Sequence, residues 1–456
     1  MSRKQVLTRD VRLATLLVIG LSALTLAAVF ALRTQGPKIE TVRPVVAASR
    51  KIDSPTQEAT DESDSAEMVR FLLDRVKRDP DDFLAENMLA SSMLQKVRET
   101  GNADYLERAK RSAELSLASV PVERNAGGLS ARARVEMAEH DFVAARDDGL
   151  RLVQIDPGGL NSWGVLTDAL LELGEYAKAD GAIHEMRKLG SDTAETEIRI
   201  SRLVFLRGDT AGAQDHLFRA LAFAQNIPAP PRETVAWCRW QLGEMAFSIG
   251  DYKAAERYYR ETLASYPDYV QALASLGRVR AALGDLPGAI QPHEKAARRF
   301  PDPTFVAALG DLYHLAGRER EAQTQYALVE QIGHLSALNG TRYNRQIALF
   351  YADHDRKPDE AFTDAVREYQ ERRDIYGADT LAWTALKAGK LAEAQKAISA
   401  ALQLSTRDAK LYYHAGMVAA ACGNRKSSRD YLQRALALSP MFDPLQAPRA
   451  RKALAQ

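Results

Sequence analysis

A single turn position that recurs along most of the chain is the feature that most constrains its fold. It separates paired amphipathic segments of about a dozen residues each. Its members are Gly174, Gly208, Gly250, Gly284, Gly317, Gly389 and Gly423, with His140 and Arg356 in the same place of the series. From residue 140 to residue 423 the steps are 34, 34, 42, 34, 33, 39, 33 and 34 residues. A period of about 34 residues that holds two helical segments predicts stacked helical hairpins.

A small residue five positions after each turn supports the same interpretation. The members of this second series are Ala145, Ala179, Ala213, Ala255, Ala289, Ala322, Ala361, Ala394 and Ser428. Glycine ends the first helix of a hairpin because it adopts the left-handed backbone conformation at little steric cost. The small residue lets the second helix cross the first closely. Proline then ends the second helix, at Pro157, Pro267, Pro301 and Pro440.

These residues resemble the tetratricopeptide repeat family, as in the stretch LGEMAFSIGDYKAAERYYRETLASYP at 242–267. The resemblance extends from about residue 126 to residue 440. It implies an all-α fold, a right-handed superhelical solenoid of about ten helix–turn–helix units. We expect a degenerate N-terminal repeat and capping region at 66–125, repeats at 126–227, a proline-rich joint at 228–235, repeats at 236–440 and a C-terminal cap at 441–456.

The segment 13–32 has no charged side chain. At 1.5 Å per residue a helix of this length spans about 30 Å, the thickness of the hydrocarbon core of a bilayer. Basic residues in the stretch 1–12 precede it and predict a cytoplasmic N-terminus. We therefore expect a single-pass signal anchor in a bacterial inner membrane, with the solenoid in the periplasm. A cleaved signal peptide is the alternative, although its apolar region is usually shorter.

A tether follows the apolar segment. Residues 33–65 contain three prolines and the acidic run ATDESDSAE. Because low hydrophobicity leaves little to pack, we expect this stretch to be disordered.

The charge balance and the rarity of cysteine exclude several classes of function. With 61 basic and 60 acidic side chains, the chain lacks the excess of positive charge that is typical of nucleic-acid binders. Cys238 and Cys422 are the only cysteines, which leaves no disulfide framework or cysteine-rich zinc site. We expect both to be reduced, buried fillers on helices.

The sequence contains no recognisable catalytic motif. His184 and His293 are each followed by glutamate, but neither has the second histidine of a zinc-protease motif four residues later. His354, between two aspartates, is expected in a solvated turn. We therefore predict that the chain is not an enzyme and requires no cofactor or metal.

The resemblance implies that the first helix of each unit lines the inner face of the solenoid. The expected partner-binding residues there are Trp237, Trp240, Glu244, Phe247, Tyr343, Gln346, Phe350, Tyr376, Trp383, Tyr413 and Met417. Aromatic side chains bury a large area at low entropic cost, which favours a groove for a protein or peptide. Trp163 occupies a helix-packing position instead.

These observations favour a membrane-tethered scaffold or adaptor that binds an unidentified protein partner, with the bilayer contacted through residues 13–32 and with no nucleic acid or small-molecule substrate. Two alternatives stay open. One is an assembly or maturation chaperone for envelope or cytochrome c-type clients. The other is a regulatory adaptor that faces the cytoplasm.

Overall fold

The computed structural model describes residues 58–190, 193–228, 230–338 and 345–455, and the side chains from residue 65 onward. The expected anchor at 13–32 lies outside these residues, as does most of the expected tether. Among the described residues, no helix combines the length and the apolar character that a membrane span requires. Helix α2 (Glu58–Arg78) begins inside the range assigned to the tether, so this boundary lies earlier than expected.

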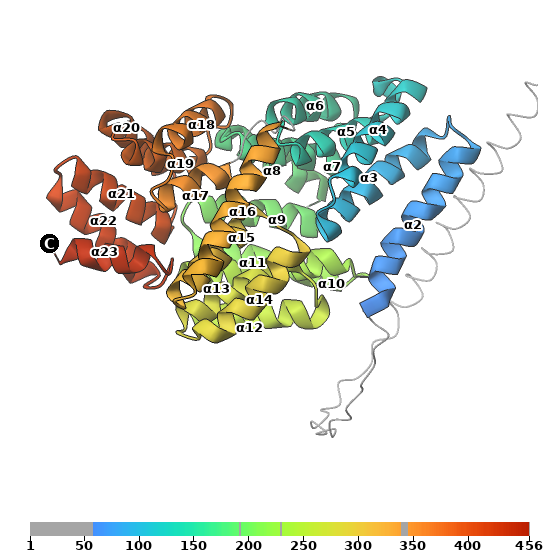
Figure 1. Ribbon diagram of the computed structural model, residues 1–456. Helices are drawn as coiled ribbons and strands as arrows, with labels where there is room; N and C mark the ends of the chain where they lie inside the picture. Colours follow the sequence, from blue (N-terminus) through green and yellow to red (C-terminus); the bar gives the residue numbers. More distant parts are fainter. Residues whose placement is uncertain (1–57, 191–192, 229, 339–344, 456) are drawn as a thin grey trace, which may run out of the picture. The chain divides into compact units, whose positions relative to one another are not determined.

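The described residues form ten antiparallel helical hairpins between two single helices, α2 and α23 (Gln446–Leu454), as Figure 1 shows. The first five hairpins are α3 (Phe83–Thr100) with α4 (Asp104–Ser119), α5 (Ala126–Ala138) with α6 (Phe142–Ile155), α7 (Leu160–Glu172) with α8 (Tyr176–Gly190), α9 (Ala194–Leu206) with α10 (Thr210–Gln225), and α11 (Arg232–Ser248) with α12 (Tyr252–Ser265). The other five are α13 (Val270–Ala282) with α14 (Leu286–Arg299), α15 (Pro303–Leu315) with α16 (Glu319–Leu338), α17 (Arg345–Asp353) with α18 (Pro358–Glu371), α19 (Ile375–Lys387) with α20 (Leu391–Ala401), and α21 (Ala409–Ala421) with α22 (Arg425–Leu438). A short 3-10 helix, η1 (Val122–Arg124), precedes α5. The structure is thus the expected all-α solenoid.

The recurring turn residue adopts the left-handed conformation that the sequence predicts, except at Arg356, where the neighbouring residues Asp355 (φ 54°) and Lys357 (φ 40°) adopt it instead. At Gly174 the φ angle is 74°, and His140 takes the same place with a φ of 61°. The next residue in several hairpins is an aspartate that caps the second helix. In one of them the Asp251 carboxylate accepts a hydrogen bond from the Ala254 amide at 3.0 Å. One residue therefore ends the first helix and its neighbour starts the second.

Within a hairpin, a glycine on the first helix faces a large side chain on the second. A Cβ atom added at Gly243 would lie 2.4 Å from Cε1 of Tyr259, and one added at Gly416 would lie 2.7 Å from Cγ of Leu432. Tyr259 and Leu432 are fully buried. These glycines set the close crossing of the two helices, because any larger residue would displace a packed side chain.

Where the step between turn residues is longer than 34 residues, a longer helix contains much of the addition. In the 39-residue step between Gly317 and Arg356, α16 extends over 20 residues. In the joint at 228–235, α11 begins directly after Pro231 and runs for 17 residues. Proline is tolerated at this place because the first turn of a helix leaves its amides unbonded.

The first helices of the hairpins line the inner side of the curve. Along the described chain α3 contacts α5, α17 contacts α19 and α19 contacts α21, whereas no comparable contact joins second helices of neighbouring hairpins. These first-helix contacts are dense at both ends of the stack and sparse from α9 through α11 and α13 to α15. The stack is therefore curved most tightly towards its ends, and its inner face is widest around α11 to α15.

Successive turns of the solenoid touch at a separation of about 200 residues. The Tyr176 hydroxyl accepts a hydrogen bond from the Ile375 amide, 199 residues away, at 2.9 Å. The Thr406 hydroxyl donates to the carbonyl oxygen of Leu206, 200 residues away. In each contact the turn inside an early hairpin meets the loop after a later one. We call this set of contacts the seam.

Candidate functional site on the inner face

A row of alternating charges runs along the inner face, six residues before each turn residue. Its members are Arg134, Asp168, Arg202, Glu244, Arg278 and Asp311, followed by the apolar Phe350, Trp383 and Met417. The alternation is visible in the sequence once the turn residues are aligned, but the search for aromatic side chains missed it. The inner face thus changes from charged to apolar between α15 and α17.

Two members of this row, Glu244 and Arg278, form an ion pair between neighbouring hairpins. The Glu244 carboxylate accepts hydrogen bonds from Tyr259 at 2.7 Å, Ser275 at 2.7 Å and Arg278 at 2.6 Å. Burial raises the pKa of this carboxyl, but Arg278 and the hydroxyl donors outweigh burial and leave the pKa below its usual value. Glu244 is therefore an ionised hub at neutral pH.

A small cavity lies beside this hub, where the inner face is widest. It has a volume of about 180 Å³. Its lining comprises Arg98, Glu99, Glu233, Trp237, Trp240, Tyr266, Asp268, Tyr269, Val270 and Gln271. These residues come from α3, from α11, from the loop after α12 and from the start of α13, so the cavity joins hairpins that are far apart in the sequence. It places two of the predicted groove tryptophans in one pocket.

Polar contacts fix the walls of this pocket. Arg98 donates two hydrogen bonds to the Glu233 carboxylate, 135 residues away, at 2.6 and 3.0 Å. The Trp240 indole donates to the Ser275 hydroxyl at 3.0 Å and meets Tyr269 edge-on, with ring centroids 6.2 Å apart. Aromatic faces and both signs of charge are thus available to one bound segment.

The eleven predicted groove residues divide into two groups. Gln346 is exposed, and Trp237, Trp240, Glu244, Tyr376 and Met417 are half-buried. Phe247, Phe350, Trp383 and Tyr413 are buried, with exposed fractions of 6%, 3%, 1% and 1%. Tyr343 lies outside the described residues. The four buried aromatic residues therefore offer little surface to a partner, and the role of all eleven residues in binding stays a prediction.

The tight curvature of the last hairpins explains the burial of Trp383 and Tyr413. The Asp353 carboxylate accepts hydrogen bonds from the Trp383 indole at 2.7 Å, from Lys410 at 2.9 Å and from Gln446 at 2.6 Å. These donors belong to the next two hairpins and to α23. Because four successive units converge on one carboxylate, the aromatic residues between them become core.

The environment of His354 also differs from the solvated turn that the sequence predicts. It lies against α15, where its Nε2 is 2.7 Å from the Asp311 carboxylate, and its Nδ1 is 2.8 Å from the Phe350 carbonyl oxygen. Burial lowers the pKa of His354, but Asp311 outweighs burial and the pKa is raised. His354 therefore bridges two hairpins instead of lying in a solvated turn. In the described part of the chain, no cluster of three or more histidine, cysteine or acidic residues is arranged to hold a metal.

The two cysteines are free, as expected. Cys238 is buried, and burial raises the pKa of its thiol to about 12. Cys422 is only partly buried. The expectation of a buried filler is therefore confirmed for Cys238 alone.

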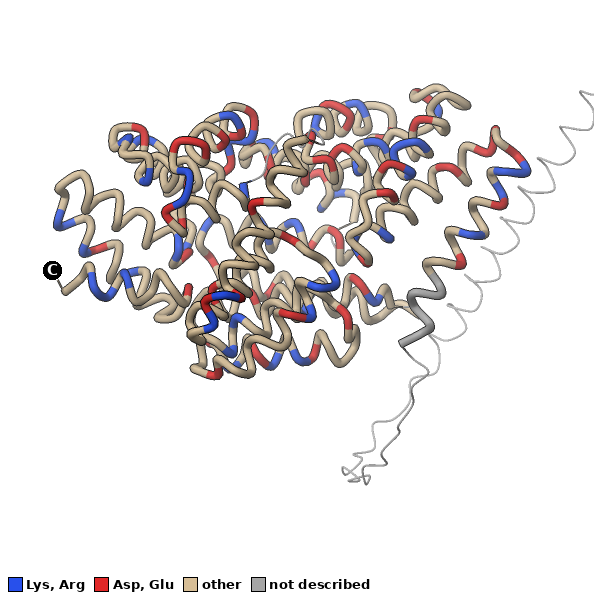
Figure 2. Tube along the Cα trace, in the orientation of Figure 1, with Lys and Arg blue, Asp and Glu red and all other residues tan. Residues whose placement is uncertain are grey.

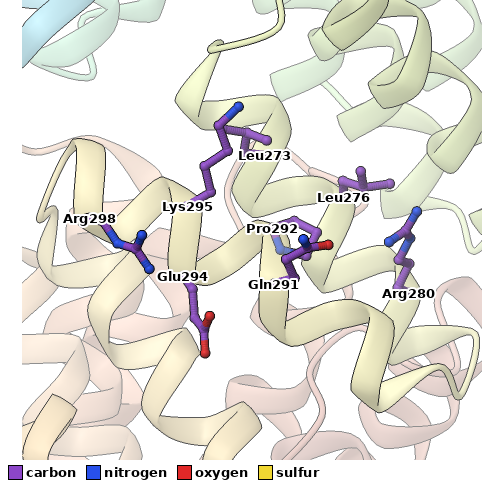
Figure 3. A pocket seen from close by; sticks show the side chains of 8 residues that line it. All are labelled: Leu273, Leu276, Arg280, Gln291, Pro292, Glu294, Lys295 and Arg298. Atoms are coloured by element: carbon purple, nitrogen blue, oxygen red, sulfur yellow. The ribbon is translucent and has the colours of Figure 1, made fainter.

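Larger but shallower cavities lie on the outer face. One of about 640 Å³ lies between α13 and α14, where Arg280, Lys295 and Arg298 surround Pro292 (Figure 3). Another of about 530 Å³ exposes Trp163, whose indole donates to the Pro157 carbonyl oxygen at 2.9 Å. Each is formed by neighbouring helices only. Acidic and basic residues are interspersed along the described chain (Figure 2).

Comparison with known proteins shows which families and relatives this chain resembles. Two family models, both described as tetratricopeptide repeat, match residues 192–268 and residues 241–302 and 380–440. A curated relative, the TPR repeat-containing protein YpiA of Bacillus subtilis (strain 168), is 22% identical over 277 residues, which is 60% of this chain. The chain spans about half of that relative, 55% of its length.

Several solved structures are also similar. PilW, described as a widely conserved type IV pilus biogenesis factor, aligns over 46% of this chain and 93% of its own, with 20% identity and a TM-score of 0.39. The human IFIT1 dimer with PPP-AAAA aligns over 84% of this chain and 96% of its own, with 14% identity and a TM-score of 0.44. Scores of this size carry no argument about function. The matched family models fall on hairpins whose turn, small-residue and capping positions are described above, and in these stretches the chain is similar to tetratricopeptide repeat proteins.

Proposed function

We propose that this protein binds an extended segment of a partner protein on its inner face, anchored in the pocket of Trp237 and Trp240. Tetratricopeptide repeat proteins are in general non-enzymatic scaffolds for protein–protein interaction. The observation that carries the finer proposal is that this pocket combines two half-buried tryptophans with Arg98 and Glu233 at the widest part of the inner face. Half-buried tryptophan is a frequent centre of binding energy at interfaces.

The test is a selection of peptides from a random phage-displayed library, followed by affinity measurement in solution. We expect Trp237→Ala to weaken binding of the selected peptides at least tenfold, because the pocket loses its largest apolar surface. Trp163→Ala is the matched control, since it removes a tryptophan from the outer face. The proposal fails if Trp163→Ala weakens binding and Trp237→Ala does not.

The same proposal includes the membrane anchoring and the cellular location of the protein. The apolar segment 13–32 and the basic residues before it support a single membrane anchor with the solenoid, wound in the right-handed sense of the family, outside the cytoplasm. A reporter that is active only outside the cytoplasm, fused after Gln456, is expected to be active. An expressed but inactive fusion would reverse the orientation.

A further inference from the structure

The seam is made by helix ends and loops. Along the described chain, the helix pairs with substantial contact are all near neighbours in the sequence, so helices of successive turns do not pack along their lengths. Two tyrosines at the start of second helices, Tyr176 and Tyr252, contribute to the contact. The Tyr252 hydroxyl accepts a hydrogen bond from the Met441 amide at 2.7 Å and lies 2.9 Å from the Ser439 hydroxyl. Ser439 in turn donates to the Phe247 carbonyl oxygen at 3.1 Å.

An ion-pair network adds to these hydrogen bonds. Glu172, at the end of α7, pairs with Arg202 on α9 and with Arg372 in the loop after α18, 200 residues away. Arg372 also lies over the Phe142 ring, 4.6 Å from its centroid. The seam thus combines polar groups, which water can satisfy when the turns separate, with the apolar contact of Ile375, which is fully buried in the cluster around Leu170 and Ile183.

The turn glycines differ according to whether they lie in the seam. A Cβ atom added at Gly174 would lie 2.5 Å from the Arg373 carbonyl oxygen, and one added at Gly208 would lie 2.6 Å from that of Ser405. At Gly250 the corresponding distance to the Leu438 carbonyl oxygen is 3.0 Å. Within the described residues, nothing lies within 4 Å of such an atom at Gly284, Gly317, Gly389 and Gly423. The seam glycines therefore permit close backbone contact in addition to ending a helix.

This arrangement restricts access to the inner face. Where successive turns touch, a polypeptide cannot reach the inner face from the side. A free chain end can enter along the solenoid axis, but a segment between two folded domains cannot be threaded through. We propose that the seam is a side gate, which opens to admit an internal segment of the partner chain. This inference rests on the proposed binding at the inner face.

Substitution of the turn glycines tests the gate without any ligand. Asparagine tolerates the left-handed conformation, and His140 shows that a side chain fits this turn. In the triple variant Gly174→Asn, Gly208→Asn and Gly250→Asn, the side chains enter the seam. In the control Gly317→Asn, Gly389→Asn and Gly423→Asn they enter open space, at the same local backbone cost.

The readout is hydrogen exchange at the Ile375 and Met441 amides, which donate across the seam. We expect exchange at both amides to be at least tenfold faster in the seam variant than in the control, with equal helix content by circular dichroism. Equal exchange in the two variants would overturn the gate. A seam variant that does not fold would be replaced by Tyr176→Phe with Tyr252→Phe, which removes only the two acceptor hydroxyls.

A disulfide across the seam tests passage of the ligand. A Cβ atom added at Gly250 would lie 3.5 Å from Cα of Ser439, which is compatible with a disulfide between cysteines at the two positions. The variant Gly250→Cys with Ser439→Cys is prepared with Cys422→Ser to prevent mispairing. The probes are one library-selected peptide, free or inserted between two folded carrier domains.

We expect the oxidised variant to bind the free peptide at the wild-type rate and the inserted peptide at least tenfold more slowly, with recovery on reduction. Binding of the inserted peptide at the wild-type rate in the oxidised variant would overturn the gate. Failure of the free peptide to bind the wild-type protein would instead contradict the proposed function, and the exchange experiment would still decide whether the seam opens.

Discussion

Glu244 and Asp353 are carboxylates on the same inner face, and each accepts hydrogen bonds from three side chains, yet they organise different surroundings. The donors to Glu244 lie 15, 31 and 34 residues away, within its own hairpin and the next. The donors to Asp353 lie 30, 57 and 93 residues away, in the next two hairpins and in α23. The first hub leaves Trp237 and Trp240 half-buried beside a cavity, whereas the second encloses Trp383.

The comparison shows that position within a repeat does not determine exposure in a solenoid. Trp383 and Glu244 occupy the same place in their repeats, six residues before the turn residue. One is 1% exposed and the other is half-buried. The difference arises from curvature, because first helices approach one another more closely in the last hairpins than around α13. A surface for a partner is therefore available only where the curve is wide.

The largest expected difference between the two regions concerns their tryptophans. Trp383→Ala is expected to lower the free energy of unfolding by about 3–5 kcal/mol, since it empties a buried site and leaves Asp353 without one donor. Trp240→Ala is expected to cost about 2 kcal/mol or less, because part of this side chain already meets solvent. Urea denaturation measures both values. Equal costs would mean that the two regions are equally packed.

A second pair of substitutions compares the two hubs. Asp353→Asn and Glu244→Gln are each expected to cost about 2–3 kcal/mol, because each removes the charge that compensates a lysine or an arginine. The two variants are expected to differ in how many helices are destabilised. Hydrogen exchange is predicted to rise from α17 to α23 in Asp353→Asn, but only in α11 to α13 in Glu244→Gln. If exchange rises over equally many hairpins in both variants, curvature does not explain the difference between the two regions.

Acid is expected to weaken the seam that joins these regions. Burial raises the pKa of Glu172, but Arg202 and Arg372 outweigh burial and bring the pKa to about 2. A carboxyl with a depressed pKa stabilises the fold above the pKa of the unfolded chain, about 4.3, and loses this effect as the pH falls towards 2. We expect a loss of about 2 kcal/mol over this range, measured by denaturation at each pH. The loss is expected to be smaller in Glu172→Gln, and an unchanged acid response would contradict the assignment.

The smallest effect is spectroscopic and leaves the fold intact. With 5-fluorotryptophan in place of tryptophan, a soluble paramagnetic agent is expected to broaden the ¹⁹F signals of Trp237 and Trp240 more than that of Trp383. The reason is the 1% exposure of Trp383. Single Trp→Phe variants assign the signals. Strong broadening at Trp383 would show that the last hairpins open in solution.

The sequence by itself determined the hairpins. The turn residues, the small residues five positions later and the aspartate caps act over a few bonds, within one or two helical turns. For this reason Gly174 and Ala289 predicted a helix end and a close crossing that the structure confirms. The count of about ten units and the all-α class followed from the same local signals.

Only the tertiary structure decided which parts of the inner face are open. The rotation from one hairpin to the next is small and is set by the packing of many side chains, so no single residue signals it. Summed over several hairpins, these rotations bury Trp383 and Tyr413, leave Trp237 accessible and bring Tyr176 to Ile375 after 199 residues. Contacts at this separation have no local pattern in the sequence, because they depend on the accumulated curvature of all the hairpins between them.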